Sequence, residues 1–377
     1  MATTGLEGVV AAETRLSRVL GEAGRLTYAG YEIEDLAEHA TFEETCHLLW
    51  SGRLPGRAEL DRLTQRLREA APVDARVLEI ARMAAKSSHP MAVLRTAVSA
   101  LAHFDPDAED GSAPAHERKA IRLTAQAVTM TAAIARFRAG LDAVAPHPQL
   151  GLAANLLYML RGEPADAVEA RTMDVAFVLH AEHGMNASTF AARVAAGTLT
   201  DMHSAVVAAI GTLKGPLHGG ANEGVMRMLQ QIGTPEAADG WVRAALERGE
   251  RIMGFGHRVY RTLDPRAPLL RAMAERLLER RDDAPWLRIS ERVQAVMAEE
   301  MERRGKKVYP NVDFFSASVY FTLGVPLELF PNLFACARMP GWTAHIMEQQ
   351  KNNRLIRPSA QYSGPDGLRV VPIDERT

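Results

Sequence analysis

A stretch of histidine, arginine and glycine at 251–266, with the sequence RIMGFGHRVYRTLDPR, has the composition of an anion-binding loop. Gly254 and Gly256 flank Phe255 just before His257, and glycine lets the main chain approach a ligand closely. Several basic residues follow the histidine, namely Arg258, Arg261 and Arg266. The pattern predicts a cradle for an anion, although a surface turn with solvated arginines would account for the charge cluster alone.

A second candidate is His218 in the stretch 214–223, KGPLHGGANE. Gly215 and Pro216 are expected to end one helix, and Gly219 and Gly220 to begin the next. The positive end of a helix dipole disfavours the charged imidazolium, so this position favours a neutral histidine. Such a histidine can donate a hydrogen bond to an oxygen that gains negative charge during a reaction.

A third candidate is Asp313, which lies among the apolar residues of the stretch 309–316, YPNVDFFS. Apolar surroundings disfavour the ionised form of a carboxyl group, which makes the carboxylate a stronger base. The alternative is an ordinary helix N-cap, because an apolar helical pattern follows Asp313 directly.

Arg338 follows the apolar run 333–337, where an unpaired guanidinium would be costly, so an anion should meet it. The anion could be a ligand or a structural carboxylate. His180 and His183 are expected at the end of an apolar helix and on one face of it. They lack the third ligand and the HExxH pattern of a zinc site, and a structural role is the simpler interpretation.

The fold is predicted to be mainly α. Hydrophobic periodicity predicts helices at 58–70, 74–86, 89–103, 115–139, 148–161, 165–182, 187–197, 201–214, 220–232, 235–249, 266–280 and 288–304. Thr41 and Glu44 form a capping box for an earlier helix that Gly52 should end. The only clear β-like stretch is 24–34.

The composition is that of an ordinary globular protein, with 377 residues, 47% hydrophobic residues and a net charge of -2. No basic field recruits nucleic acid or a membrane surface. Cys46 and Cys336 are too few for a disulfide framework. No apolar run reaches the ~18–20 residues of a membrane span, and the N-terminus has no signal-peptide pattern, so we expect a soluble, cytoplasmic protein.

Taken together, these stretches closely resemble the citrate synthase family. GFGHRVYRTLDPR (254–266) agrees throughout with the family signature, and GPLHGGANE (215–223) and PNVDF (310–314) match its other two catalytic motifs in the right order. The resemblance runs from about Gly5 to Pro365. It implies an acyltransferase that condenses acetyl-CoA with oxaloacetate and water, through an enol or enolate and citryl-CoA, to give citrate and CoA.

The resemblance also implies a role for each catalytic residue. The carboxylate matching Asp313 removes a proton from the methyl group of acetyl-CoA. The histidine matching His218 donates a hydrogen bond to the thioester oxygen, and the one matching His257 donates to the oxaloacetate carbonyl. The acid–base work needs no metal and no cofactor other than the CoA thioester, which is a substrate.

The remaining site residues are likewise carried over by the family pattern. The oxaloacetate ligands are His183, Arg266, Arg338 and Arg357. The CoA-binding residues are Met253, Gly254, Phe255, Gly256 and Arg261. In the family, the equivalent of Arg357 reaches the neighbouring subunit's site, which implies a homodimer.

The family architecture implies a large helical domain (1–220 and 325–377) with a smaller helical domain (221–324) inserted and closing over oxaloacetate. The chain resembles the short, dimeric bacterial or archaeal form, without the extra N-terminal region of longer forms that NADH regulates. The nearest alternative is 2-methylcitrate synthase, which uses propionyl-CoA and shares these motifs. Two hypotheses from other functional classes are a non-catalytic helical binding protein and a metalloenzyme with His180 and His183 as metal ligands.

Overall fold

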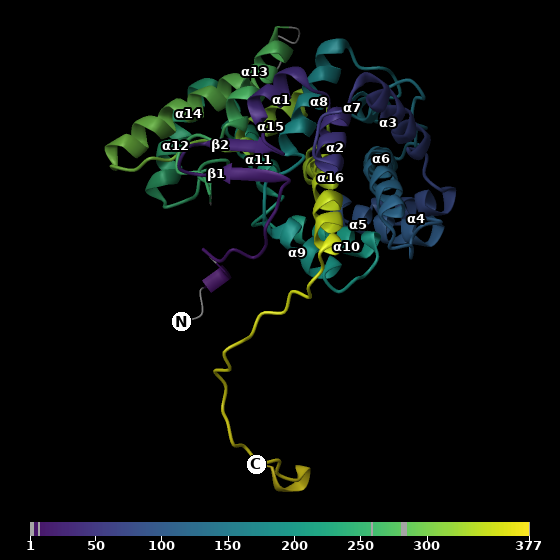
Figure 1. Cartoon of the computed structure of the whole chain (residues 1–377). Helices are drawn as coiled ribbons and strands as arrows, with labels where there is room; N and C mark the ends of the chain where they lie inside the picture. Colours follow the sequence, from purple (N-terminus) through teal and green to yellow (C-terminus); the bar gives the residue numbers. More distant parts are fainter. Residues whose placement is uncertain (1–3, 7, 258, 280–284, 377) are drawn as a thin grey trace.

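The computed structural model describes residues 4–6, 8–257, 259–279 and 285–376, and helices form most of it (Figure 1). The prediction of a mainly α fold is therefore confirmed. None of the helices in the described ranges is long and apolar enough to cross a membrane.

The only sheet among the described residues has three short antiparallel strands in the order β1-β2-β3. The strands are β1 (Ser17–Leu20), β2 (Arg25–Tyr28) and β3 (Tyr31–Glu32). Ser17 pairs with Tyr28, and Thr27 pairs with Glu32. The predicted β-like stretch 24–34 contains β2 and β3. The prediction missed β1, because its four residues show no alternating pattern and form a strand only by pairing with β2.

The first ten helices precede the motif around His218. They are α1 (Ile33–His39), α2 (Phe42–Ser51), α3 (Arg57–Ala70), α4 (Ala75–Ala85), α5 (Pro90–Leu101), α6 (Ala113–Arg138), α7 (Leu152–Arg161), α8 (Ala167–His180), α9 (Ala187–Ala196) and α10 (Met202–Leu213). The six that follow are α11 (Ala221–Ile232), α12 (Ala238–Glu247), α13 (Arg266–Leu278), α14 (Trp286–Arg303), α15 (Val312–Thr322) and α16 (Phe330–Lys351).

Local capping sets where α2 begins and ends. Thr41 Oγ1 accepts from the Glu44 main-chain N–H at 3.2 Å, and Glu44 Oε2 accepts from the Thr41 N–H at 2.8 Å. Gly52 ends the helix in the left-handed region, with φ of 79°. The predicted capping box and stop are both confirmed.

Two long helices, α6 and α16, contact each other and are buried on nearly all sides. Both are apolar around most of their circumference, as expected of helices covered on every face. Gly341 brings α16 close to the turn after α8, because a Cβ there would lie 2.3 Å from the Ala181 carbonyl oxygen. This close approach places Arg338 beside the segment 180–183.

The helices α11–α15 pack mainly on one another, through α13 with α15, α11 with α15 and α12 with α14. Figure 1 shows α12, α13 and α14 on one side of the molecule and α3 and α4 on the opposite side. Contacts of α13 with α8, α15 with α8 and α11 with α16 join this group to the remaining helices. The division into residues 1–220 with 325–377 and residues 221–324 stays a prediction.

After α16 the chain leaves the helical body as an extended, exposed arm, residues 353–376 (Figure 1). The arm contains one short 3-10 helix at Ile373–Glu375. Its apolar side chains Leu368, Val370 and Ile373 are 79%, 89% and 70% exposed.

Candidate active site

Asp313 is the second residue of α15, and its carboxyl group has no hydrogen-bond donor in the described part of the chain. Asn311 is the N-cap, since its side-chain oxygen accepts from the Asp313 main-chain N–H at 3.0 Å. The alternative prediction that Asp313 caps the helix is wrong, because Asn311 already fills that role. Burial raises the pKa of Asp313 to about 6, against the opposing charge of Arg266. The side chain is therefore free to act as a base.

The glycine-rich loop is fastened to the start of α15 by its own main chain. The Gly254 carbonyl accepts from Asn311 N–H, and Gly256 N–H donates to the Tyr309 carbonyl, both at 2.9 Å. Asn311 Nδ2 also donates to the Gly256 carbonyl at 2.9 Å. Gly254 has φ of 80°, and a Cβ there would lie 2.8 Å from the Phe314 ring, so glycine is required. His257 and Asp313 are consequently held on one connected unit.

His257 has a defined tautomer. Its Nδ1 accepts from the main-chain N–H groups of Val259 and Tyr260, at 3.0 and 3.1 Å. In a neutral imidazole the proton must then be on Nε2, which becomes a donor. Burial, with help from the charge of Arg266, lowers the pKa of His257 to about 4, so the ring is neutral at physiological pH. Arg258, which was predicted to be part of the anion cradle, lies outside the described residues.

His218 lies between α10 and α11, three residues before α11 begins, as the glycine pattern predicts. Its Nε2 accepts from the Ser188 N–H at 3.3 Å and lies 2.8 Å from Ser188 Oγ. Because a main-chain N–H can only donate, Nε2 carries no proton and Nδ1 is the donor. Burial and then Arg338 lower the pKa of His218 to about 4. Trp342 Nε1 donates to Ser188 Oγ at 3.2 Å and fixes that hydroxyl.

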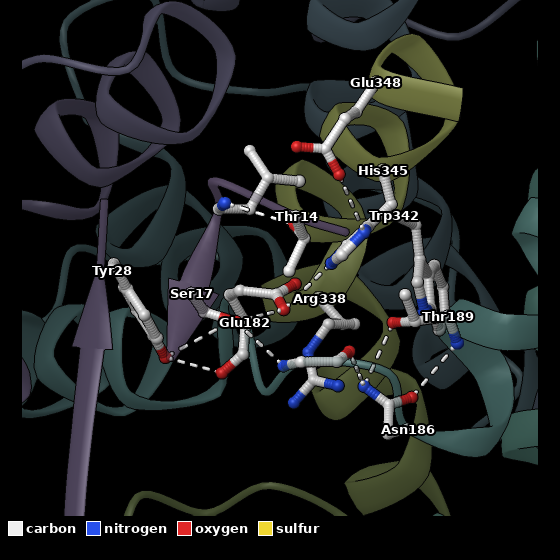
Figure 2. Close-up of polar contacts among 12 residues, drawn as sticks. Thr14, Ser17, Tyr28, Glu182, Asn186, Thr189, Arg338, Trp342, His345 and Glu348 are labelled. Carbon is white, nitrogen blue, oxygen red and sulfur yellow. Dashed lines mark hydrogen bonds and ion pairs between the residues drawn. The ribbon is translucent and has the colours of Figure 1, made fainter. Parts of the chain in front are cut away.

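The two histidines at 180 and 183 do not share a helix face, so that prediction is wrong. The helix α8 ends at His180, whose Nδ1 lies 2.7 Å from the Ala176 carbonyl, while His183 lies beyond the helix. Tyr28 holds this turn, since its hydroxyl donates to the Glu182 carbonyl at 2.9 Å (Figure 2). The described residues contain no group of three or more His, Cys, Asp or Glu side chains arranged to bind a metal ion.

Arg266 is almost fully buried and forms a two-pronged ion pair with Asp264. Its Nε donates to Asp264 Oδ1 at 2.9 Å and its Nη2 to Oδ2 at 2.7 Å. Asp264 Oδ2 also accepts from the Val312 N–H at 3.2 Å, which ties the pair to α15. Burial alone would raise the pKa of Asp264, but Arg266 holds it below the ordinary value. Sequence reasoning missed Asp264, although the Asp-x-Arg spacing matches a local bidentate pair.

Arg338 is 1% exposed and has no carboxylate within ion-pair distance among the described residues. Its Nε donates to the His180 carbonyl at 2.6 Å, while its Nη1 is buried without a hydrogen-bond partner there. Burial lowers its pKa to about 10, so the group is still charged at neutral pH. The alternative prediction, that Arg338 pairs with a structural carboxylate, is therefore wrong within the described residues. A buried guanidinium with an unused N–H is arranged to receive an anion.

Behind Arg338, Glu182 is held by residues from two other elements. Ser17 Oγ donates to Glu182 Oε1 at 2.9 Å, and His345 Nε2 lies 3.0 Å from the same oxygen (Figure 2). Burial would raise the pKa of Glu182, but His345 and Arg338 hold it below its usual range. Glu182 therefore places negative charge near Arg338 without contacting it. Sequence reasoning missed both residues, although Glu182 lies between the two histidines of the stretch 180–183.

The two buried arginines are the shared neighbours of the titratable residues. The field of Arg266 acts on the pKa of His257, and that of Arg338 on the pKa of His218. Both act on the pKa values of Asp313 and His183. The predicted residues from three motifs are thereby brought to one region.

The other predicted site residues are more peripheral. Met253 is half-buried and Phe255 is buried in the loop, and Arg261 donates its main-chain N–H to the Gly21 carbonyl at 3.1 Å. Arg357 lies in the exposed arm, and its side chain forms no hydrogen bond or ion pair within the described part of the chain. The structure of one chain does not bring Arg357 to the other site residues.

The site combines a carboxylate of raised pKa, two neutral imidazole donors and two buried arginines. These groups suit an enzyme that performs acid–base chemistry on an anionic substrate. Comparison with known proteins identifies the class. The family profile described as "Citrate synthase, C-terminal domain" matches residues 5–359. The chain belongs to the citrate synthase family. It is an enzyme of the citrate synthase type, an acyltransferase, so the predicted class is confirmed and the alternative of a non-catalytic binding protein is wrong.

Individual relatives agree along nearly their whole length. "Citrate synthase 2" of Bacillus subtilis is 49% identical, covering 100% of this chain and 99% of the relative. "Citrate synthase" of Haloferax volcanii is 48% identical, covering 99% and 98%. "2-methylcitrate synthase" of Mycobacterium tuberculosis is 45% identical, covering 98% and 92%. The solved structure of the Thermoplasma acidophilum citrate synthase ternary complex with carboxymethyl coenzyme A and oxaloacetate has a TM-score of 0.93 at 34% identity, covering 100% of both chains.

The titration of Asp313 predicts how activity depends on pH. We expect kcat/KM for the acyl-CoA substrate to fall about tenfold per pH unit below pH 6, because only the ionised carboxylate can accept a proton. His218 and His257, with pKa values of about 4, stay neutral down to pH 5 and add no further slope. Steady-state rates between pH 5 and 8, with circular dichroism as the control for folding, test this. A flat profile across that range would contradict the assignment.

Proposed function

We propose that the chain condenses acetyl-CoA with oxaloacetate and water to give citrate and CoA, using Asp313, His218 and His257. The observation that carries the proposal is the pair of neutral histidines with opposite donor atoms. Main-chain N–H groups occupy Nε2 of His218 and Nδ1 of His257, leaving Nδ1–H and Nε2–H as the donors. Together with the Asp313 carboxylate, whose pKa is raised by burial, they supply a base and two separate oxygen-stabilising groups.

In the first step, the Asp313 carboxylate takes a proton from the methyl group of acetyl-CoA. The electron pair moves onto the thioester oxygen, and His218 Nδ1–H donates to that oxygen as its negative charge grows. A pKa of about 6 makes Asp313 a better base than an ordinary aspartate, while it remains mostly ionised at neutral pH.

In the second step, the enolate carbon attacks the ketone carbon of oxaloacetate and the new carbon–carbon bond forms. His257 Nε2–H donates its hydrogen bond or proton to the ketone oxygen as it becomes an alcohol. Water then cleaves the thioester of citryl-CoA, which releases citrate and CoA. No step requires a metal ion.

Arginines suit the two carboxylates of oxaloacetate, because a planar guanidinium binds a carboxylate with two parallel hydrogen bonds. We assign Arg266, Arg338 and Arg357 to this role, with His183 as a further ligand. Arg338 supports the assignment most directly, since its buried Nη1 lacks a partner. Arg266 already uses Nε and Nη2 on Asp264, so its remaining Nη1 is the atom we assign to the substrate.

We assign the loop around Met253–Gly256, with Arg261, to CoA. The Gly254 carbonyl and both polar main-chain groups of Gly256 are engaged with 309–311. The main-chain groups of Met253 and Phe255 form no such bonds within the described residues, so they are the ones proposed to meet the adenine. Arg261 is exposed and is assigned to the CoA phosphates.

We further propose a cytoplasmic homodimer in which Arg357 completes the neighbouring subunit's site and residues 221–324 close over oxaloacetate. The exposed arm supports this, because Leu368, Val370 and Ile373 would gain from being covered by a second chain. Closure would exclude water until the condensation is complete. Both cysteines are buried free thiols, as is usual for a reducing compartment.

Replacing the base tests the central assignment. We expect Asp313→Ala to lose CoA release from acetyl-CoA and oxaloacetate by at least about 100-fold, because general-base catalysis contributes roughly 10²–10⁴-fold. Asp61→Ala, an exposed aspartate in α3, is the matched control and should keep full activity. Activity of folded Asp313→Ala within a few-fold of the parent would refute the role.

Arg357→Ala tests both the ligand role and the shared site. We expect the KM for oxaloacetate to rise about 10- to 100-fold without dissociation of the dimer, as for loss of a charge-assisted hydrogen bond. At oxaloacetate concentrations well below the parent KM, where Arg357→Ala dimers contribute little, mixing subunits that carry Arg357→Ala with subunits that carry Asp313→Ala should give about a quarter of the parent activity. Half of the dimers are then mixed, and each mixed dimer has one complete site. No recovery after verified subunit exchange would place Arg357 in its own chain's site or outside the site.

The choice of acyl-CoA separates the two family activities, since a 2-methylcitrate synthase is 45% identical to this chain. We expect kcat/KM to favour acetyl-CoA over propionyl-CoA, and one methyl group can be worth about 10- to 200-fold. A strong preference for propionyl-CoA would replace citrate by 2-methylcitrate as the product while leaving the residue roles intact.

The alternative of a metalloenzyme has its own test. Full activity in EDTA would exclude His180 and His183 as ligands of an essential metal.

A further inference from the structure

Tyr260 contacts two of the proposed substrate-binding histidines in different ways. Its hydroxyl oxygen lies 3.2 Å from His183 Nε2, and its main-chain N–H donates to His257 Nδ1 at 3.1 Å. The three rings form a compact cluster, with centroid distances of 5.6 Å between His183 and Tyr260, 4.7 Å between His257 and Tyr260, and 5.3 Å between the histidines. Tyr260 is 4% exposed, so the cluster has little room to rearrange.

We propose that Tyr260 is a positioning residue for oxaloacetate, one that sets the tautomer of His183 and the angle between His183 and His257. This inference rests on the proposed function, because it takes His183 as a carboxylate ligand and His257 as the carbonyl donor. Tyr260 acts through these histidines rather than on the reacting atoms.

The protonation states of Tyr260 and His183 allow Tyr260 to be the donor in this hydrogen bond. Burial raises the pKa of Tyr260, so its hydroxyl keeps its hydrogen. Burial and then the charged or titratable groups that face His183 (Arg266, His257 and Arg338) hold its pKa well below the usual range, so the ring is neutral. Nε2 of His183 is the only acceptor that the described residues offer to this hydroxyl. In the proposed arrangement Tyr260 donates to Nε2, and the single ring proton of His183 is on Nδ1.

The consequence is a pair of donors with fixed identity. His183 presents Nδ1–H and His257 presents Nε2–H, and the ring of Tyr260 packs against both. Without the hydroxyl, His183 could carry its proton on either nitrogen, and only one of these tautomers keeps the donor in place. The His183–Tyr260 contact joins two segments that are distant in the sequence. The next residue, Arg261, adds a third segment, because its main-chain N–H donates to the Gly21 carbonyl in the β1–β2 turn.

Tyr260→Phe removes the hydroxyl and keeps the ring. We expect the KM for oxaloacetate to rise about 5- to 30-fold, the usual effect of losing one buried hydrogen bond, with kcat and the KM for acetyl-CoA within about threefold of the parent. Tyr158→Phe is the matched control, because the Tyr158 ring packs edge-on against His147 at 5.4 Å, away from the site. This control should leave all three constants unchanged.

A second readout separates positioning from general support of the fold. In protein labelled with ¹⁵N-histidine, the His183 ring should report a proton on Nδ1 in the parent and a mixture of tautomers in Tyr260→Phe. Tyr260→Leu, which also removes the ring, should lower kcat as well, because His257 loses its packing partner.

Two results would overturn the proposal. One is an unchanged KM for oxaloacetate in Tyr260→Phe. The other is an equal loss in every constant together with a lower Tm, which would indicate a structural role only. If the parent enzyme condenses neither acetyl-CoA nor propionyl-CoA with oxaloacetate, the proposed function fails instead, and the two failures are distinguishable.

Discussion

The buried ion pair between Asp264 and Arg266 is the interaction on which the site depends most. Removing two charges from water is costly, and hydrogen bonds to both oxygens of Asp264 offset part of that cost. Asp264 accepts two hydrogen bonds from the Arg266 side chain, one from its main chain and one from Val312 N–H. The pair thus fixes the loop that carries His257 to the helix that carries Asp313.

Burial sets the protonation states of His218, His257 and Asp313, and Arg266 and Arg338 modify them. Both histidine donors are neutral chiefly because burial penalises the imidazolium, and each has a buried arginine nearby that adds to the effect. Asp313 shares both arginines as neighbours, yet burial outweighs their attraction and raises its pKa to about 6. One low-dielectric, positively charged environment therefore keeps the donors neutral while the base remains strong. A more exposed site would lose both properties together.

Much of this arrangement is local and could be predicted from the sequence. The capping box at Thr41 and Glu44 and the helix start after Gly220 involve residues within a few positions of one another. The family motifs likewise mark His218, His257 and Asp313. Contacts between distant segments gave no such signal. Ser188 reaches His218 across 30 positions and Tyr28 reaches Glu182 across 154, and both depend on how the helices pack. The prediction that His183 shares the helix α8 with His180 failed for the same reason. The helix ends at His180, whose carbonyl accepts a hydrogen bond from Arg338 of the distant helix α16.

Under the proposed division at 220/221 and 324/325, the catalytic groups are split between the two parts. His257, Arg266 and Asp313 lie on the inserted segment and are bonded into one unit, whereas His183, His218 and Arg338 lie on the other part. With the proposed roles, proton removal needs Asp313 from one part and His218 from the other, so neither part would form the enolate alone. The His183–Tyr260 contact at 3.2 Å crosses the same proposed boundary and joins the two groups at the proposed oxaloacetate site. Binding of oxaloacetate between them would therefore stabilise the closed arrangement in which the base and its donor act together.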